Sequence, residues 1–215
     1  MKELFTSTNL SFLLQGLWLT LYISFISIVL STLIGTILAV MRNGKSRFLK
    51  LLSSIYIEFV RNVPNLLWIF IIFLVFQMKS TPAGITSFTV FTSAALAEII
   101  RGGFLGVDHG QYEAAAALGL PAWRRTVRII LPQALRTILP SGFNEIISLA
   151  KGTAMVYVLA MPELFYTIQM IYNRTQEVIP LLMVGAVWYL VITTVLSVIQ
   201  HVVERGLARS ERRSA

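Results

Sequence analysis

Residues 10–41 read LSFLLQGLWLTLYISFISIVLSTLIGTILAVM and contain no charged side chain. At about 1.5 Å per residue, a helix of this length is longer than the roughly 30 Å of hydrocarbon in a bilayer. The stretch therefore predicts a membrane-spanning helix. We expect it to be retained rather than cleaved, because it is too long for the apolar region of a signal peptide and follows Lys2-Glu3 rather than a strongly basic segment.

The composition extends this interpretation to the whole chain. Of its 215 residues, 56% are hydrophobic and 13% are charged, whereas soluble domains carry about 25% charged residues. Five apolar runs predict five transmembrane helices within one all-α transmembrane domain, residues 1–215. The predicted spans cover about residues 12–41, 51–78, 85–105, 135–161 and 179–203.

The basic residues predict the orientation. Twelve of them follow the first span, lie in the loop after the third span, or belong to the C-terminal tail: Arg42, Lys45, Arg47, Lys50, Arg124, Arg125, Arg128, Arg136, Arg205, Arg209, Arg212 and Arg213. The opposite side holds only Lys2, Lys79 and Arg174. The positive-inside rule then places the N-terminus outside and the C-terminus in the cytoplasm. The net charge of +8 is explained by this pattern and does not indicate nucleic-acid binding.

Small residues follow one face of the first predicted helix. Thr20, Ser24, Ser27, Ser31 and Gly35 are spaced by three or four residues. Such a face lets helix backbones approach each other in lipid, so we favour helix packing over the alternative, a pore lining. A further segment, residues 162–177, predicts a short interfacial helix on the outer side.

Polar residues also line the fourth predicted span. Asn144, Ser148 and Lys151 share one column of the helix, and Glu145 lies in the neighbouring column. A charged group that faces lipid costs several kcal/mol. Glu145 and Lys151 lie about 120° apart around a helix, which places them poorly for pairing with each other. We therefore favour a cavity at this stripe over a purely structural network.

Three charged residues in the second and third spans need partners. Arg61 precedes Pro64, near the middle of the second span, where a kink frees backbone carbonyls. Its guanidinium requires a carboxylate from Glu58, Glu98, Glu145 or a ligand, and a ligand-binding and a structural role both remain open. Glu98 and Arg101, three residues apart, are expected to form a local ion pair.

Motifs for catalysis are missing from the sequence. It contains no cysteine, no metal-ligand spacing, no nucleophile motif and no phosphate-binding glycine loop. The sequence therefore predicts no enzyme chemistry, no catalytic residue and no metal or cofactor on this chain.

The loop at about residues 110–122 predicts a short helix. Glu113, Ala114, Ala115 and the alanines after them are strong helix formers, and Gly119 is suited to the helix C-terminus. A helix of alanines has too little bulk to build its own core, but it fits the groove of another protein. A solvated connector is the alternative.

The spacing in this loop resembles the EAA signature of bacterial ABC importer permeases. The matching residues are Glu113-Ala114-Ala115, Gly119, Ile129 and Leu131-Pro132. Other segments resemble the polar amino acid subfamily of these permeases: Gly16 with Thr20-Leu21, Arg61-Asn62-Val63-Pro64, Ala97-Glu98-Ile99-Ile100-Arg101-Gly102-Gly103, Leu131-Pro132-Gln133-Ala134-Leu135-Arg136 and Glu163-Leu164. The resemblance covers about residues 12–205.

This resemblance implies the type I ABC importer permease fold, in the bacterial inner membrane, and a pairing with a second permease, identical or homologous. Two cytoplasmic ATPase subunits, which carry ATP and Mg²⁺, would bind around Glu113, Ala114, Ala115 and Gly119. An external solute-binding protein would deliver a polar amino acid, and alternating access would carry it inward.

The resemblance also implies a substrate pocket at mid-membrane depth. Arg61 and Lys151 would hold the substrate carboxylate, Glu145 would hold a cationic group, and Asn144 and Ser148 would lie beside them. The chain departs from the family's usual pattern in two places. Asn62-Val63 replaces Gly-Thr, and Gly152-Thr153-Ala154-Met155 replaces Asp-Thr-Ser-Leu, so we expect a pocket of different polarity. The sequence does not specify the amino acid, although Glu145 favours a basic one.

Other functional classes explain less of the sequence. A stand-alone secondary amino acid transporter, the main alternative, needs a coupling-ion site and usually internal repeats, and neither is visible. A membrane-embedded enzyme needs convergent catalytic residues near one interface. A permease of an exporter would not carry the EAA pattern.

Overall fold

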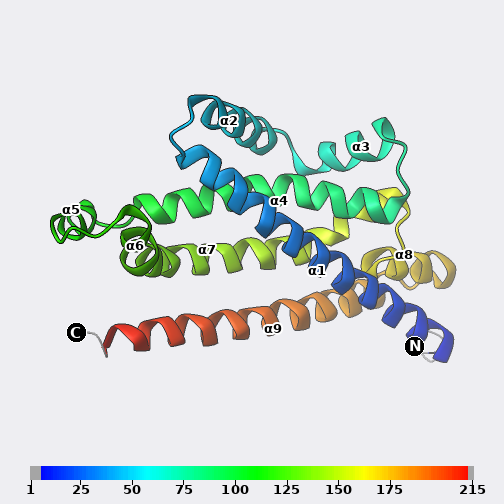
Figure 1. Ribbon diagram of the computed structural model, residues 1–215. Coiled ribbons are helices and arrows are strands. Elements are labelled where there is room, and N and C mark those ends of the chain that lie inside the picture. The colour runs from blue at the N-terminus through cyan, green and yellow to red at the C-terminus, as the bar shows by residue number, and fades with distance from the viewer. Residues whose placement is uncertain (1–5, 213–215) are drawn as a thin grey trace.

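The computed structural model describes residues 6–212, and every regular element in that range is a helix (Figure 1). Three uninterrupted helices are long and apolar enough to cross a membrane: α1 (Ser7–Asn43), α4 (Ser80–Leu105) and α9 (Val178–Arg212). Two bent helix pairs raise the number of candidate spans to as many as five. The chain is therefore all-α, as predicted. Lys2 and Arg213, used above for orientation, lie outside the described range.

The second predicted span is broken in the middle. Helices α2 (Arg47–Asn62) and α3 (Asn65–Val75) meet at 107°. Pro64 lacks a backbone donor and forces the residue before it out of the helical region, and Val63 has φ −100° and ψ 133°. The predicted kink is present, but residues 51–78 do not form one continuous helix. The pair still leads from the end of α1 to the start of α4, at the other end of the bundle (Figure 1).

The fourth predicted span belongs to a longer, irregular helical run. It begins with α6 (Ala122–Arg125) and a π-helix (Thr126–Ile130), continues as α7 (Leu131–Gly152), and ends as a 3₁₀-helix (Thr153–Leu159). After a bend of 50°, α8 (Leu164–Thr175) follows. The short helix predicted within residues 162–177 is α8.

Helix α1 packs its stripe of small residues against α4 and, toward its N-terminal end, against α8. The stripe is buried and consists of Gly16, Thr20, Ser24, Ser27, Ser31, Gly35 and Ala39. At Gly35 the two backbones nearly touch, because a Cβ there would lie 2.9 Å from the Ser93 carbonyl oxygen. The preference for helix packing over a pore lining is confirmed.

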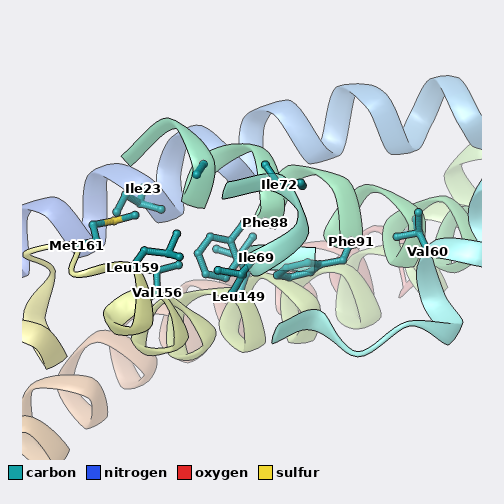
Figure 2. Packing of buried hydrophobic residues seen from close by; sticks show 12 residues of the cluster. Ile23, Val60, Ile69, Ile72, Phe88, Phe91, Leu149, Val156, Leu159 and Met161 are labelled. Atoms are coloured by element: carbon teal, nitrogen blue, oxygen red, sulfur yellow. The ribbon is translucent and has the colours of Figure 1, made fainter. Parts of the chain in front are cut away.

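The largest hydrophobic core lies where α1, α2, α3, α4, α7 and the 3₁₀-helix meet (Figure 2). Phe88 and Phe91 of α4 occupy its centre, with their rings edge to face at a centroid distance of 5.3 Å. The other labelled members are Ile23, Val60, Ile69, Ile72, Leu149, Val156, Leu159 and Met161. This core joins both halves of the broken span to α4 and α7.

The two ends of the bundle carry different elements (Figure 1). The start of α1 and α8 lie at one end. The end of α1, α6, the C-terminal part of α9 and α5 (His109–Ala117) lie at the other. With each bent pair counted as one span, the described residues contain five candidate spans, and α5 projects beyond the body of the bundle (Figure 1).

Candidate functional site

Helix α5 is attached to the C-terminal end of α4 and to the N-terminal end of α7. The Asp108 side chain caps α5 by accepting a hydrogen bond from the Gly110 backbone N–H at 2.6 Å. The Tyr112 hydroxyl donates to the Phe104 carbonyl oxygen of α4 at 3.1 Å. Val107 and two residues of the π-helix and α7, Ile130 and Ala134, form a small buried core beneath it. The short helix predicted from the alanine run is therefore present as α5, and it is anchored to α4 and α7.

Gly119 ends α5 in the way that its sequence position predicts. Its φ of +69° lies in the left-handed region that only glycine adopts at little cost. Its N–H donates to the Ala116 carbonyl oxygen at 2.9 Å, and the Leu120 N–H donates to that of Ala115 at 3.4 Å. These two bonds form a Schellman motif, which turns the chain sharply toward α6.

Several apolar side chains of α6, the π-helix and the end of α5 are exposed. Leu118 and Trp123 are 77% and 61% exposed, and Val127 is also exposed. Glu113 and Ala114 of α5 are exposed as well, whereas Ala115 is buried. We call the exposed set Glu113, Ala114, Leu118, Trp123 and Val127 the tip surface. Large apolar side chains clustered on a projecting element are typical of protein interaction sites.

The polar stripe of α7 lies on an open face of the helix. Ser141, Asn144, Ser148 and Lys151 are exposed, and Glu145 is half-buried. The column predicted for Asn144, Ser148 and Lys151 is therefore present as one face. Asn144 additionally accepts a hydrogen bond from Gln200 of α9 at 3.4 Å.

Lys151 lines a cavity of about 300 Å³ between α7, α8 and α9. Its other walls are Ala154, Phe165, Ile168, Leu182, Gly185, Ala186 and Tyr189. Lys151 is the one charged residue among these lining residues, and neither Arg61 nor Glu145 belongs to them. The expectation that Arg61, Glu145 and Lys151 share one pocket therefore does not hold for this cavity.

Behind that cavity lies a buried carboxylate. Glu163 is fully buried and accepts hydrogen bonds from the backbone N–H groups of Phe165 and Tyr166 at 2.9 and 2.7 Å. The Tyr189 hydroxyl donates to the same carboxylate at 3.0 Å. Tyr189 therefore both lines the cavity and donates a hydrogen bond to Glu163 through its hydroxyl. Sequence reasoning missed Tyr189, because no local spacing links it to Glu163.

Arg61 does not pair with Glu58, its nearest candidate in the sequence. Glu58 accepts a hydrogen bond from Arg42 at 2.9 Å instead. Within residues 6–212, Arg61 forms no ion pair within 4.0 Å, and it is exposed in the last turn of α2. Arg61 is therefore available to another partner.

The predicted pair of Glu98 and Arg101 is confirmed, and it has a third member. The Arg101 Nε donates to the two Glu98 carboxylate oxygens at 3.0 and 3.1 Å. Arg42 of α1 also donates to Glu98, at 2.7 Å. Sequence reasoning treated Arg42 only as a loop cation. The buried spacing Ser31, Gly35, Ala39 continues to Arg42 and was the available signal.

Comparison with known proteins gives one consistent picture. Residues 31–209 match the family described as binding-protein-dependent transport system inner membrane component. A probable glutamine ABC transporter permease protein of Bacillus subtilis (strain 168) is 37% identical over 201 residues, which cover 90% of this chain and 92% of that protein. An L-cystine transport system permease protein of the same strain is 33% identical over 200 residues, with 90% and 86% covered. A solved amino acid ABC transporter with histidines aligns with a TM-score of 0.86 at 32% identity, over 92% of this chain and 95% of that one.

Proposed function

The chain belongs to the family of binding-protein-dependent transport system inner membrane components, and we propose that it is the permease subunit of an ATP-binding cassette importer for a polar amino acid. Relatives named for glutamine and cystine transport support an amino acid as the cargo. The chain itself hydrolyses no ATP. ATP and Mg²⁺ bind to separate ATPase subunits, and the permease converts their motion into alternating access.

In the proposed permease all five candidate spans cross the bilayer, with the N-terminus outside and the C-terminus in the cytoplasm. Helices α5 and α6 and the C-terminal part of α9 share one end of the bundle (Figure 1). Arg124, Arg125 and Arg205 belong to these elements. The positive-inside rule assigns that end to the cytoplasm.

The tip surface is the observation that carries the proposal. Its apolar side chains, Leu118 and Trp123 above all, stand on helices fixed to both α4 and α7. A surface of this kind gains free energy when a partner covers it, and its rigid attachment transmits the partner's movement. We assign it to an ATPase subunit, with one ATPase for each of two permeases.

The polar face of α7 supports a second permease, identical or homologous. Lys151 and its neighbours Ser148 and Asn144 would be costly to expose to lipid. A second subunit that covers this face encloses a polar path between the two chains. Lys151 then supplies an ammonium group for the substrate carboxylate.

Glu145 and Arg61 line the same path at a deeper level. Glu145 precedes Lys151 by six residues, so it lies about 9 Å closer to the cytoplasmic end of α7. A substrate delivered by an external solute-binding protein meets Lys151 first. Glu145 then offers its carboxylate to a cationic group of the substrate. Arg61, which forms no ion pair within the described residues, offers a second site for the substrate carboxylate.

Reconstitution tests the function directly. The chain is assembled with its ATPase subunits, a second permease and the solute-binding protein in proteoliposomes, and uptake of labelled glutamine, cystine and arginine is measured. We expect uptake of at least one of them, and only with ATP inside and the binding protein outside. Uptake by the chain alone, driven by an ion gradient, would instead establish the secondary transporter.

A matched pair of variants tests the tip surface. Trp123→Ala removes a tip residue, and Trp18→Ala removes a tryptophan of α1 that is 70% exposed on the bundle. Loss of a central interface tryptophan commonly weakens binding by about thirty-fold or more. We expect Trp123→Ala to lower retention of the ATPase subunits during purification and Trp18→Ala to leave it unchanged. Equal retention in both variants would contradict the assignment.

A further inference from the structure

An ion-pair network ties the C-terminal ends of α1 and α2 to α4. The two terminal guanidinium nitrogens of Arg42 donate to different helices: one to Glu98 of α4 at 2.7 Å and the other to Glu58 of α2 at 2.9 Å. Arg101 binds the same Glu98 carboxylate. The group contains two cations and two carboxylates, so its charge is balanced. Arg42 is its centre, because it alone reaches both α2 and α4.

The network lies at the point where α4 leads into α5. Glu98 precedes the end of α4 at Leu105 by seven residues, or about 10 Å, and only residues 106–108 separate α4 from α5. Arg42 occupies the last turn of α1. Among these elements, α4 has the direct covalent connection to α5. Any displacement of α5 reaches α1 and α2 only through contacts such as this network.

Near Arg42, the packing between α1 and α4 rests on small residues. Gly35 and Ala39 of α1 present almost no side chain, and Ala97 of α4 is equally small. Such residues let the two backbones approach closely. Arg42 is different, because a planar guanidinium holds its carboxylates in a fixed direction. Its side chain is 16% exposed and that of Glu98 is 22% exposed, so solvent screens the pair weakly.

We propose that Arg42 and Glu98 are positioning residues for transport: their ion pair makes the inner end of α1 move together with α4 when the docked ATPase displaces α5. This inference rests on the proposed function of the tip surface. Without the pair, α4 and the end of α1 respond separately to the displacement of α5, and ATP hydrolysis is spent without opening the path. With it, α1 and α4 respond together.

Two carboxylates of the same network provide a matched comparison. Glu98→Gln separates Arg42 from α4. Glu58→Gln removes the other carboxylate that Arg42 binds, but it leaves the link to α4 intact, and Glu58 is the more exposed of the two, at 56%. Each variant is assembled in the complete transporter, and substrate uptake and ATP hydrolysis are measured in the same vesicles. We expect Glu98→Gln to lower uptake per ATP hydrolysed by roughly three- to thirty-fold, the range typical of residues that carry coupling. Glu58→Gln should keep the parental ratio.

A distance measurement separates positioning from mere loss of structure. The chain has no cysteine, so spin labels on cysteines introduced at Lys45 and Leu105 report the separation of the α1 end from the α4 end. We expect one narrow distance with and without nucleotide in the parent and in Glu58→Gln. In Glu98→Gln the distance should match the parent without nucleotide and change when nucleotide binds.

Unchanged uptake per ATP in Glu98→Gln, or an unchanged labelled distance, would overturn the proposal. If Glu98→Gln fails to assemble, Arg42→Gln takes its place, because it removes the cation that Glu98 binds. Parental coupling in Arg42→Gln would overturn the proposal equally. Failure of the proposed function would look different, since the parental complex itself would then show no ATP-dependent uptake.

Discussion

Gly16 of α1 lies directly against Thr167 of α8. A Cβ atom on Gly16 would come within 2.5 Å of the Thr167 hydroxyl oxygen and 3.0 Å of the Glu163 carbonyl oxygen. One turn further along α1, Thr20 accepts a hydrogen bond from the Leu164 backbone N–H at 3.1 Å. The N-terminal part of α1 thus packs on the start of α8, and glycine is required for that contact.

Adding one methyl group at Gly16 should destabilise the protein. Gly16→Ala forces α1 and α8 apart, at a cost of about 1–3 kcal/mol for overpacking. Gly142→Ala is the control, because a Cβ at this helical position meets no atom within 4 Å and alanine favours the helix by up to about 1 kcal/mol. Thermal unfolding in detergent should show a lower Tm for Gly16→Ala and an equal or higher Tm for Gly142→Ala. Equal shifts in Tm for the two variants would show that Gly16 does not pack closely against Thr167.

Glu163→Gln should destabilise the end of the bundle at which α8 begins. One carboxylate oxygen accepts from the Tyr166 N–H, and the other accepts from the Phe165 N–H and the Tyr189 hydroxyl. Either orientation of a glutamine amide therefore places its NH₂ group against a backbone donor. A buried group left unsatisfied costs about 1–3 kcal/mol, and thermal unfolding would measure the loss.

A double-mutant cycle checks that the loss belongs to this network. Tyr189→Phe removes one hydrogen bond, worth about 0.5–1.5 kcal/mol, and keeps the ring on the Lys151 cavity. Because both residues share a contact, the double variant should lose less than the sum of the single variants. Strict additivity would mean that Tyr189 and Glu163 do not interact in the folded protein.

Gly119→Val should uncouple ATP hydrolysis from uptake while leaving insertion into the membrane intact. No atom lies within 4 Å of the added Cβ, so the effect arises from the φ of +69° and not from a clash. A branched residue there costs about 1–2 kcal/mol or unwinds the end of α5. Gly119→Asn, which tolerates the left-handed region, should retain coupling. Parental uptake in Gly119→Val would refute the role of this turn.

Glu145→Ala should lower uptake of cationic amino acids more than that of neutral ones. Its half-buried carboxylate is proposed to hold a cationic group of the substrate, and losing a charge-assisted hydrogen bond costs about 1.5–3 kcal/mol. Asn144→Ala, next to it on α7, removes a neutral polar group of the same proposed path and should lower uptake of both classes equally. Uptake assays with arginine and glutamine side by side would decide, and an equal fall for both in Glu145→Ala would exclude direct recognition of the side chain.

Local features of this protein were predictable from sequence. The pair of Glu98 and Arg101, the buried face of α1 and the cap at Gly119 involve residues within a few positions of each other or on one helix face. Helix geometry alone decides such relationships, because each residue rotates the side chain by a nearly constant angle. The break at Pro64 follows for the same local reason.

The sequence by itself therefore determined that the chain is helical and membrane-embedded, which helix faces are buried, and which loop projects. The tertiary structure decided which charged and polar side chains contact each other. Glu58 faces Arg42 and leaves Arg61 free of an ion pair within the described residues, Lys151 shares a cavity with α8 and α9, and Arg42 reaches Glu98 across 56 positions. Spacing along one helix cannot state where a second helix crosses it, and that crossing is set by the packing of all the helices at once.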